Sequence, residues 1–200
     1  MLMHLLYDWG GLNRELFAAI NGLRGPVLDT LMLAGTRLGS AWNAGWIALG
    51  LALLLACRRL APQTTLTARL PEARTLARLL RVFVVASVLA LILVSAAKHG
   101  FDMPRPAAAL PPGSVAVLAP TVEPYSLPSG HSAFAMLVAV VFWPACPRPW
   151  RAALALGALW VGVSRVSVGA HFPADVVAGY LCGAACAGLA ARMVPPARGD

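Results

Sequence analysis

The sequence predicts an all-α integral-membrane helical bundle, and two observations carry this prediction: the composition and the places where the charges lie. Of the 200 residues, 59% are hydrophobic and 12% are charged, which is about half the charged share of a typical soluble domain. The charges are bunched, and long uncharged, mostly apolar runs separate them. A soluble protein with unusually apolar core helices is the alternative, but so many apolar runs would leave it little amphipathic surface for water.

Five apolar runs come close to the length that a helix needs to cross a bilayer, which is about 17–25 residues. Runs slightly shorter than this can still span, because Arg and Lys at helix ends extend their charged groups towards the lipid headgroups. We therefore expect five transmembrane helices, at residues 40–57, 80–98, 131–146, 150–166 and 174–192.

The segment before the first span is expected to form amphipathic helices that lie in the membrane interface. In residues 1–24, leucine and isoleucine recur at helical spacing with polar residues between them. A second short helix is expected at residues 26–38, because Pro26 occupies a favoured first helical position. Asp29 and Arg37 make this segment a poor span, so both helices are placed flat in the interface. Alternatively, one of them crosses, which gives six spans and a cytoplasmic N-terminus.

Basic residues are concentrated in the loop after the first span, the loop between the third and fourth spans, and the C-terminal tail. Ten of the 16 Lys and Arg residues lie there, namely Arg58, Arg59, Arg69, Arg74, Arg78, Arg81, Arg148, Arg151, Arg192 and Arg198. With five spans, these regions share one side of the membrane, which the positive-inside rule assigns to the cytoplasm. We expect the anionic inner leaflet, rather than nucleic acid, to be the partner of this charge; an RNA-binding patch is the alternative.

The domain organisation follows from these spans. We expect interfacial helices at residues 1–39, a transmembrane domain at 40–194 and a cytoplasmic tail at 195–200. The compact chain and the lack of organelle signals favour a multi-pass protein of a bacterial inner (plasma) membrane.

A second group of polar residues lies at or near the outer ends of spans two to five. Its members are Lys98, His99, Asp102, Arg105, Ser129, His131, Ser164, Arg165, His171 and Asp175. Ionisable residues that gather at one end of membrane helices indicate a functional site. Three cations, histidines and a carboxylate suit an anion-binding site that also carries out acid–base chemistry.

Three motifs in this group resemble the signature of the type 2 phosphatidic acid phosphatase superfamily. They are Lys-x6-Arg-Pro, Pro-Ser-Gly-His and Ser-Arg-x5-His-x3-Asp, and they begin at Lys98, Pro128 and Ser164. All three are complete and follow the order of that family. The resemblance implies a membrane enzyme that hydrolyses a lipid phosphate or diphosphate through a phosphohistidine intermediate, with no metal and no other cofactor.

The resemblance also assigns the catalytic roles. His171 matches the nucleophile that attacks phosphorus, and His131 matches the general acid that protonates the departing lipid oxygen. Asp175 matches the carboxylate that holds the nucleophilic imidazole and stabilises its cation, as an aspartate does in hydrolase triads. Because one imidazole has to be neutral and the other protonated, their environments have to push the two pKa values apart.

Phosphate binding is assigned to a cradle of five residues: Lys98, Arg105, Ser129, Gly130 and Arg165. The three cations can neutralise the charge that a transferring phosphoryl group spreads over its oxygens. Ser129 and Gly130 precede a predicted helix, whose free N–H groups favour anions, and Ser129 can also act as the N-cap. Ser164 is expected to be a packing hydroxyl. We expect Glu123 and Tyr125 to line the entrance.

Several alternatives remain open at this stage. Undecaprenyl diphosphate is the first expected substrate, and phosphatidic acid, phosphatidylglycerol phosphate and lipid A phosphates are the others. A lipid phosphotransferase would use the same phosphohistidine with another acceptor, whereas the soluble vanadium haloperoxidases of the family do not fit the spans. From another class, a non-catalytic transporter or scaffold with a degenerate site is the rival. The oligomeric state stays open.

Overall fold

The fold is all-α, as the sequence predicts. The computed structural model describes residues 7–61, 64, 67, 70–120 and 123–196. Its helices, in order, are η1 (Trp9–Gly11), α2 (Leu12–Gly22), α3 (Pro26–Leu38), α4 (Asn43–Leu60), α5 (Ala73–Phe101), α6 (Pro106–Ala109), α7 (Gly130–Phe142), η3 (Trp143–Ala145), α8 (Arg148–Ser167) and α9 (Pro173–Met193). Parts of three predicted segments lie outside the described residues: 1–6, Arg69 in the basic loop, and 197–200, which includes Arg198.

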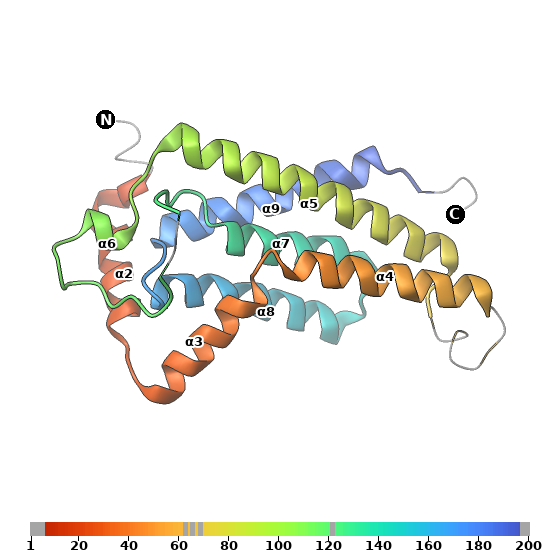
Figure 1. The fold of residues 1–200 in the computed structure, drawn as a ribbon, viewed down its shortest axis with the longest axis horizontal. Coiled ribbons are helices and arrows are strands. Elements are labelled where there is room, and N and C mark those ends of the chain that lie inside the picture. The colour runs from red at the N-terminus through yellow and green to blue at the C-terminus, as the bar shows by residue number, and fades with distance from the viewer. Residues whose placement is uncertain (1–6, 62–63, 65–66, 68–69, 121–122, 197–200) are drawn as a thin grey trace.

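Five long helices form a bundle in which α4, α5, α7, α8 and α9 lie alongside one another (Figure 1). Three of them, α4, α5 and α9, are long and apolar enough to cross a membrane, and the segment Gly130–Ala145 is a shorter apolar helix. In α8, Arg148 and Arg151 in the first turn and Arg165 in the last lower the mean hydropathy. Membrane-spanning helices are therefore confirmed, while spans at α7 and α8, and with them the total of five, stay a prediction.

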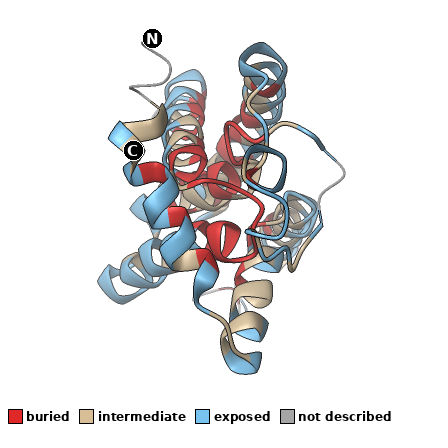
Figure 2. Ribbon diagram, turned by 90° about the vertical axis from the view of Figure 1, so that its left-hand side faces the viewer, coloured by how far each residue is buried: buried red, intermediate tan, exposed pale blue. Residues whose placement is uncertain are grey.

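The outer surface of the bundle carries many exposed apolar side chains. Leu91, Ile92 and Leu181 are 70%, 61% and 67% exposed on α5 and α9. Buried residues gather in the middle when the molecule is viewed end-on (Figure 2), around a core that includes Phe83, Leu137 and other residues of α5, α7 and α9. An apolar surface this extensive would be a liability in water but suits contact with lipid chains.

Two glycines let α9 approach α7 closely. A Cβ atom on Gly179 would overlap the carbonyl oxygen of Ser129, and one on Gly183 would overlap that of Ala133. The two glycines are four residues apart, a spacing of small residues that is common where membrane helices meet. This close approach places the start of α9 beside the start of α7, where the N–H of Ser129 donates to the Asp175 carbonyl oxygen at 2.9 Å.

The chain places its two polar groups at opposite ends of the bundle. The last turns of α5 and α8 and the first turns of α7 and α9 meet at one end, so the three motifs come together there (Figure 1). The starts of α5 and α8 and the ends of α4 and α9 lie at the other end, with the described arginines of the basic regions.

The N-terminal helix α2 lies across the end of the bundle that carries the motifs (Figure 1). Its buried residues are Asn13, Phe17 and Asn21, which pack against the protein, while Leu12, Leu16 and Leu23 are exposed. The segment predicted to be amphipathic, residues 1–24, contains this helix, and its placement in the membrane interface stays a prediction. The face with the two asparagines is a protein contact. The reason is that its two asparagines find hydrogen-bond partners in the bundle.

Candidate active site

The site is built around a short loop between α8 and α9 that carries His171. The backbone N–H groups of Ala170 and His171 both donate to the carbonyl oxygen of Arg165, at 3.1 and 3.2 Å. Gly169 has φ of +78° and passes so close to the Ala116 carbonyl that no side chain would fit, which explains why glycine stands there. The loop is therefore tight, and it leaves the His171 side chain almost completely buried.

The two ring nitrogens of His171 face different partners. Nδ1 lies 3.5 Å from Oδ2 of Asp175 and 3.3 Å from the hydroxyl of Ser126. Nε2 lies 3.4 Å from Nη1 of Arg105. Because a carboxylate only accepts hydrogen bonds, we assign the ring proton to Nδ1. That tautomer leaves the lone pair of Nε2 pointing towards the side of the site where Arg105 lies.

The Asp175 carboxylate is fully buried and receives hydrogen bonds from several donors. Oδ2 accepts from the Phe172 N–H at 2.8 Å and from the Ser126 hydroxyl at 2.5 Å, and Oδ1 accepts from the Tyr7 hydroxyl at 2.9 Å. Donors of this kind stabilise a buried charge that would otherwise be costly. Neither Ser126 nor Tyr7 was expected from the sequence at this carboxylate, and no local pattern marks them.

Burial sets the protonation state of the candidate nucleophile. Desolvation lowers the pKa of His171 to about 4, and the hydrogen bond and charge of Asp175 oppose this decrease only in part. The imidazole is therefore neutral near pH 7. Its Nε2 lone pair, which accepts from Nη1 of Arg105 in this structure, is the one that could attack an electrophile.

Arg105 is held by backbone carbonyl groups at the side of His171. Its Nε donates to the carbonyl oxygen of Glu123 at 2.6 Å and its Nη1 donates to that of Ala170 at 2.9 Å. Carbonyl oxygens do not neutralise a guanidinium, so the positive charge stays available to an anion beside Nε2 of His171.

Arg165, in the last turn of α8, is 2% exposed. Its Nη1 donates to the hydroxyl of Thr36 on α3 at 3.3 Å, while its Nε has no hydrogen-bond partner among the described residues. No carboxylate within the described part of the chain pairs with it either. A buried guanidinium without a counter-charge is costly, and an anionic ligand would compensate for that cost.

Lys98, in the last turn of α5, is mostly buried and forms an ion pair with the carboxylate of Glu123. The Glu123 side chain itself is 61% exposed, in keeping with its expected place at the entrance. A lysine predicted to bind phosphate thus has an internal anion as its partner.

His131, in the first turn of α7, has no hydrogen-bond partner among the described residues, so its ring nitrogens are available to a ligand. It lies within the electrostatic influence of Lys98, Arg105, Arg165 and His171. The charged members of the three motifs therefore do converge on one place.

Ser129 forms the N-cap of α7. Its Oγ accepts from the N–H of Ser132 at 3.4 Å and from the Ser132 hydroxyl at 3.0 Å, and the side chain is fully buried. At Gly130, an added Cβ would meet only the Val94 side chain, at 3.7 Å. Protein packing therefore does not require glycine at 130.

The remaining polar residues of the motif region lie outside the cluster. The hydroxyl of Ser164 donates to the Val161 carbonyl oxygen at 2.6 Å and lies 3.2 Å from that of Thr36, which is a packing contact. His99 and Asp102 are exposed. The described residues contain no group of three His, Cys, Asp or Glu side chains that could hold a metal ion.

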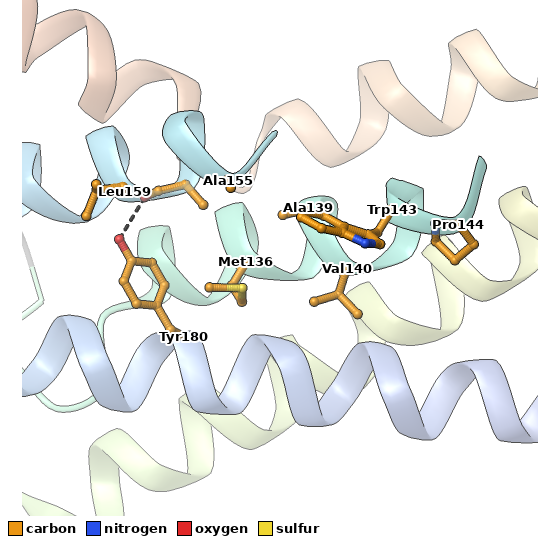
Figure 3. A pocket seen from close by; sticks show the side chains of 9 residues that line it. Met136, Ala139, Val140, Trp143, Pro144, Ala155, Leu159 and Tyr180 are labelled. Atoms are coloured by element: carbon orange, nitrogen blue, oxygen red, sulfur yellow. Dashed lines mark hydrogen bonds between the residues drawn. The ribbon is translucent and has the colours of Figure 1, made fainter. Parts of the chain in front are cut away.

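A cavity of about 560 Å³ lies farther along the bundle, between α7, α8 and α9 (Figure 3). Its lining is apolar and includes Met136, Val140 and Leu159. Tyr180 borders it, and its hydroxyl donates to the Ala158 carbonyl oxygen at 2.7 Å. The cavity shares no residue with the cluster around His171.

Comparison with known proteins places the motifs in a family context. The PAP2 superfamily, whose name abbreviates type 2 phosphatidic acid phosphatase, matches residues 79–198, and these residues contain all three motifs. The undecaprenyl-diphosphatase of Sulfolobus acidocaldarius is 31% identical over 174 residues, which cover 86% of this chain and 74% of that protein. The lipid A 1-phosphatase of Rhizobium johnstonii is 48% identical over 63 residues, but these cover 30% of this chain and only 24% of that protein.

Two solved structures share the fold. The crystal structure of Aquifex aeolicus LpxE has a TM-score of 0.70 and 30% sequence identity, and the alignment covers 90% of this chain and 95% of that one. A PAP2-type phosphatidylglycerolphosphate phosphatase from Bacillus subtilis has a TM-score of 0.65 with 21% identity, over 93% of this chain and 86% of that one. At that lower identity, the second likeness concerns the fold alone.

Proposed function

The chain belongs to the PAP2 superfamily, and from that membership we propose that it hydrolyses a lipid phosphate or diphosphate through a phosphohistidine on His171. The predicted family is thereby confirmed, and with it the broad class of membrane lipid phosphatases. One observation carries the mechanism: the buried ring of His171 has Nδ1 towards Asp175 and Nε2 towards Arg105.

In the first step, Nε2 of His171 attacks phosphorus. A nitrogen–phosphorus bond forms, the bond from phosphorus to the lipid-side oxygen breaks, and its electron pair goes to that oxygen. His131 donates the proton that the departing oxygen needs. Asp175 keeps the proton of His171 on Nδ1 and stabilises the positive charge that develops on the ring, as in hydrolase triads.

The second step regenerates the enzyme. His131, now neutral, accepts a proton from a water molecule, whose oxygen attacks the phosphohistidine. The nitrogen–phosphorus bond breaks, its electron pair returns to Nε2, and inorganic phosphate leaves. With water as the acceptor the reaction is hydrolysis, whereas a second lipid or alcohol in its place would make the protein a phosphotransferase.

Lys98, Arg105 and Arg165 are the groups that we propose to neutralise the phosphoryl oxygens. The positions of the three side chains support this role, because all three are at least half-buried at the same end of the bundle. Arg165 also has no carboxylate partner among the described residues. Positive groups fixed in advance around a developing charge are a major source of rate enhancement. Ser129 and Gly130 add the start of α7 to this cradle.

Undecaprenyl diphosphate is our first candidate substrate, because the relative of that name matches 86% of this chain. A second candidate is the 1-phosphate of lipid A, favoured by the 48% identity over a short segment to a lipid A 1-phosphatase. Both lipids place an anionic phosphate at the edge of the bilayer. Phosphatidic acid and phosphatidylglycerol phosphate complete the set that needs to be tested.

We propose that the site opens on the periplasmic face of a bacterial inner membrane. The support comes from charge: the described arginines of the basic regions lie at the end of the bundle opposite to the motifs (Figure 1), and such regions tend to face the cytoplasm.

Phosphate release from the four lipids in detergent, with EDTA present, tests the activity. We expect release from at least one of them and at least a thousandfold less from His171→Ala. His99→Ala is the matched control, since His99 is exposed near the same end of the bundle, and it should keep wild-type activity. Release from none of the lipids would favour a non-catalytic protein, and full activity of His171→Ala would exclude the phosphohistidine.

A further inference from the structure

The buried face of α2 carries two asparagines, which is unusual for the inner face of an amphipathic helix. Asn13, Phe17 and Asn21 follow one another at intervals of four residues and are 1%, 1% and 3% exposed. A buried amide is costly unless it is hydrogen-bonded. Asn13 bonds to α9, whereas Asn21 bonds both to the end of α8 and, through two hydrogen bonds, to the backbone of Ala116.

Asn13 binds the start of α9. Its Oδ1 accepts from the N–H of Ala174 at 2.9 Å. The N–H groups in the first turn of a helix have no partner within the helix, so a side chain that accepts from one of them fixes that turn. Ala174 directly precedes Asp175, and this contact therefore holds the backbone that carries the carboxylate.

Asn21 binds the end of α8. Its Nδ2 donates to the carbonyl oxygen of Ser167 at 2.9 Å, and Arg24 donates to the same oxygen at 2.6 Å. Between the two asparagines, the ring of Phe17 packs on that of Phe172, with centroids 5.1 Å apart. The N-terminal helix thus holds the His171 loop at both of its ends and in between.

Tyr7 extends this contact to the carboxylate itself. Its hydroxyl donates to Oδ1 of Asp175 at 2.9 Å, while Oδ2 of the same carboxylate faces Nδ1 of His171. Burial and the neighbouring carboxylate raise the pKa of Tyr7, so the phenol keeps its proton. Tyr7 is therefore a hydrogen-bond donor to Asp175 near neutral pH.

We propose that the N-terminal segment from Tyr7 to Arg24 is a positioning element of the active site, with Tyr7 as the residue that orients Asp175. The segment lies outside residues 79–198, which match the PAP2 superfamily. This inference rests on the proposed function of His171. Tyr7 acts through Asp175 and touches no reacting atom, so its loss affects the attack on phosphorus and leaves the cations of the cradle in place.

The expected effect is a decrease in kcat with little change in KM. A hydrogen bond to a charged group contributes enough that its removal lowers kcat about tenfold to a hundredfold. KM stays within about twofold, because Lys98, Arg105 and Arg165 are unchanged. A residue with a merely structural role would instead lower the amount of active protein, without this division between the two constants.

The test compares Tyr7→Phe, Asn13→Ala and Tyr180→Phe in the full-length protein, with the fastest-hydrolysed of the four lipids in detergent micelles as the probe. Tyr180→Phe is the matched control, because it also removes one hydroxyl that donates within the protein, but beside the apolar cavity. We expect kcat to fall about tenfold or more in Tyr7→Phe, and also to fall in Asn13→Ala. Tyr180→Phe should behave like the wild type.

The His171→Ala variant distinguishes a failure of the positioning role of Tyr7 from a failure of the proposed phosphohistidine mechanism. If His171→Ala is inactive and Tyr7→Phe has wild-type kcat, the positioning role is wrong and the phosphohistidine stands. If His171→Ala is fully active, the proposed function itself fails. Thermal unfolding in detergent identifies a variant that does not fold, and in that case the other N-terminal variant decides: wild-type kcat in a folded Asn13→Ala would equally overturn the proposal.

Discussion

Replacement of Asp175 by asparagine is the sharpest test of how the His171 site works. The side chain keeps its size and one acceptor oxygen, but it loses its charge and gains an NH2 group. In the protein, Oδ2 accepts from Phe172 and Ser126 and faces Nδ1 of His171, and Oδ1 accepts from Tyr7. Whichever way the amide turns, its NH2 group faces a donor.

The expected decrease in kcat follows from the number of hydrogen bonds to the carboxylate that are lost. A hydrogen bond to a charged group contributes about 1.5–3 kcal/mol, so the loss of two of them in the transition state amounts to about 3–6 kcal/mol. This corresponds to a decrease in kcat of roughly 10²- to 10⁴-fold. An amide can also hold the imidazole as the wrong tautomer, with the proton on Nε2, as occurs when the aspartate of a hydrolase triad is replaced by asparagine.

The assay is phosphate release under substrate saturation in EDTA, with thermal unfolding to show that the variant is folded. Asp102→Asn makes the same chemical change at an exposed carboxylate near the same end of the bundle, and it should keep wild-type kcat. Should a folded Asp175→Asn protein retain more than a tenth of the wild-type kcat, the assignment of Asp175 to the orientation of His171 would be refuted.

Three further predictions concern packing, ligand competition and pH. Gly183→Ala places a methyl group against a backbone carbonyl of α7 and should lower the free energy of unfolding by about 1–3 kcal/mol, which is measured as a lower unfolding temperature in detergent. Gly188→Ala, which has open space around it, should leave the unfolding temperature unchanged. Glu123→Gln removes the carboxylate paired with Lys98, so inorganic phosphate should inhibit the variant at a severalfold lower concentration; equal inhibition of both proteins would contradict competition at that lysine. The buried His171 has a pKa of about 4 in the folded protein, against 6.5 in the unfolded chain, so the unfolded chain binds more protons between these two pH values. The free energy of unfolding should therefore fall by about 3 kcal/mol as the pH decreases from 6.5 to 4. Urea unfolding of His171→Gln should lack this pH dependence.

The sequence by itself determined the helices and the part of the site that lies in local motifs. An apolar run that continues for a helix length predicts a span from nearby residues alone, and α4, α5 and α9 appear close to the expected positions. Lys98 ends the second predicted span, His131 begins the third, and His171 lies between the fourth and the fifth. Alternation of spans alone therefore brings Lys98, His131 and His171 to one end of the bundle.

Some features could not be predicted in this way, because they depend on how helices pack. Tyr7 and Asp175 are 168 positions apart in the sequence, and Ser126 and Asp175 are 49 apart. No periodic pattern connects such residues. The same is true of Gly183, where only glycine fits because the carbonyl group of Ala133 lies against it in the packed bundle.

The N-terminal helix illustrates the division most clearly. Its sequence determined that it is a helix with one apolar face, and this pattern fits a membrane surface as well as a protein surface. Only the tertiary structure shows that the buried face is the one with Asn13, Phe17 and Asn21, while Leu12, Leu16 and Leu23 stay exposed. The amides of Asn13 and Asn21 would be costly if buried without partners, and they bond to backbone groups of Ala174, Ser167 and Ala116. Local spacing fixes which residues share a face, whereas the packing of distant segments fixes what that face contacts.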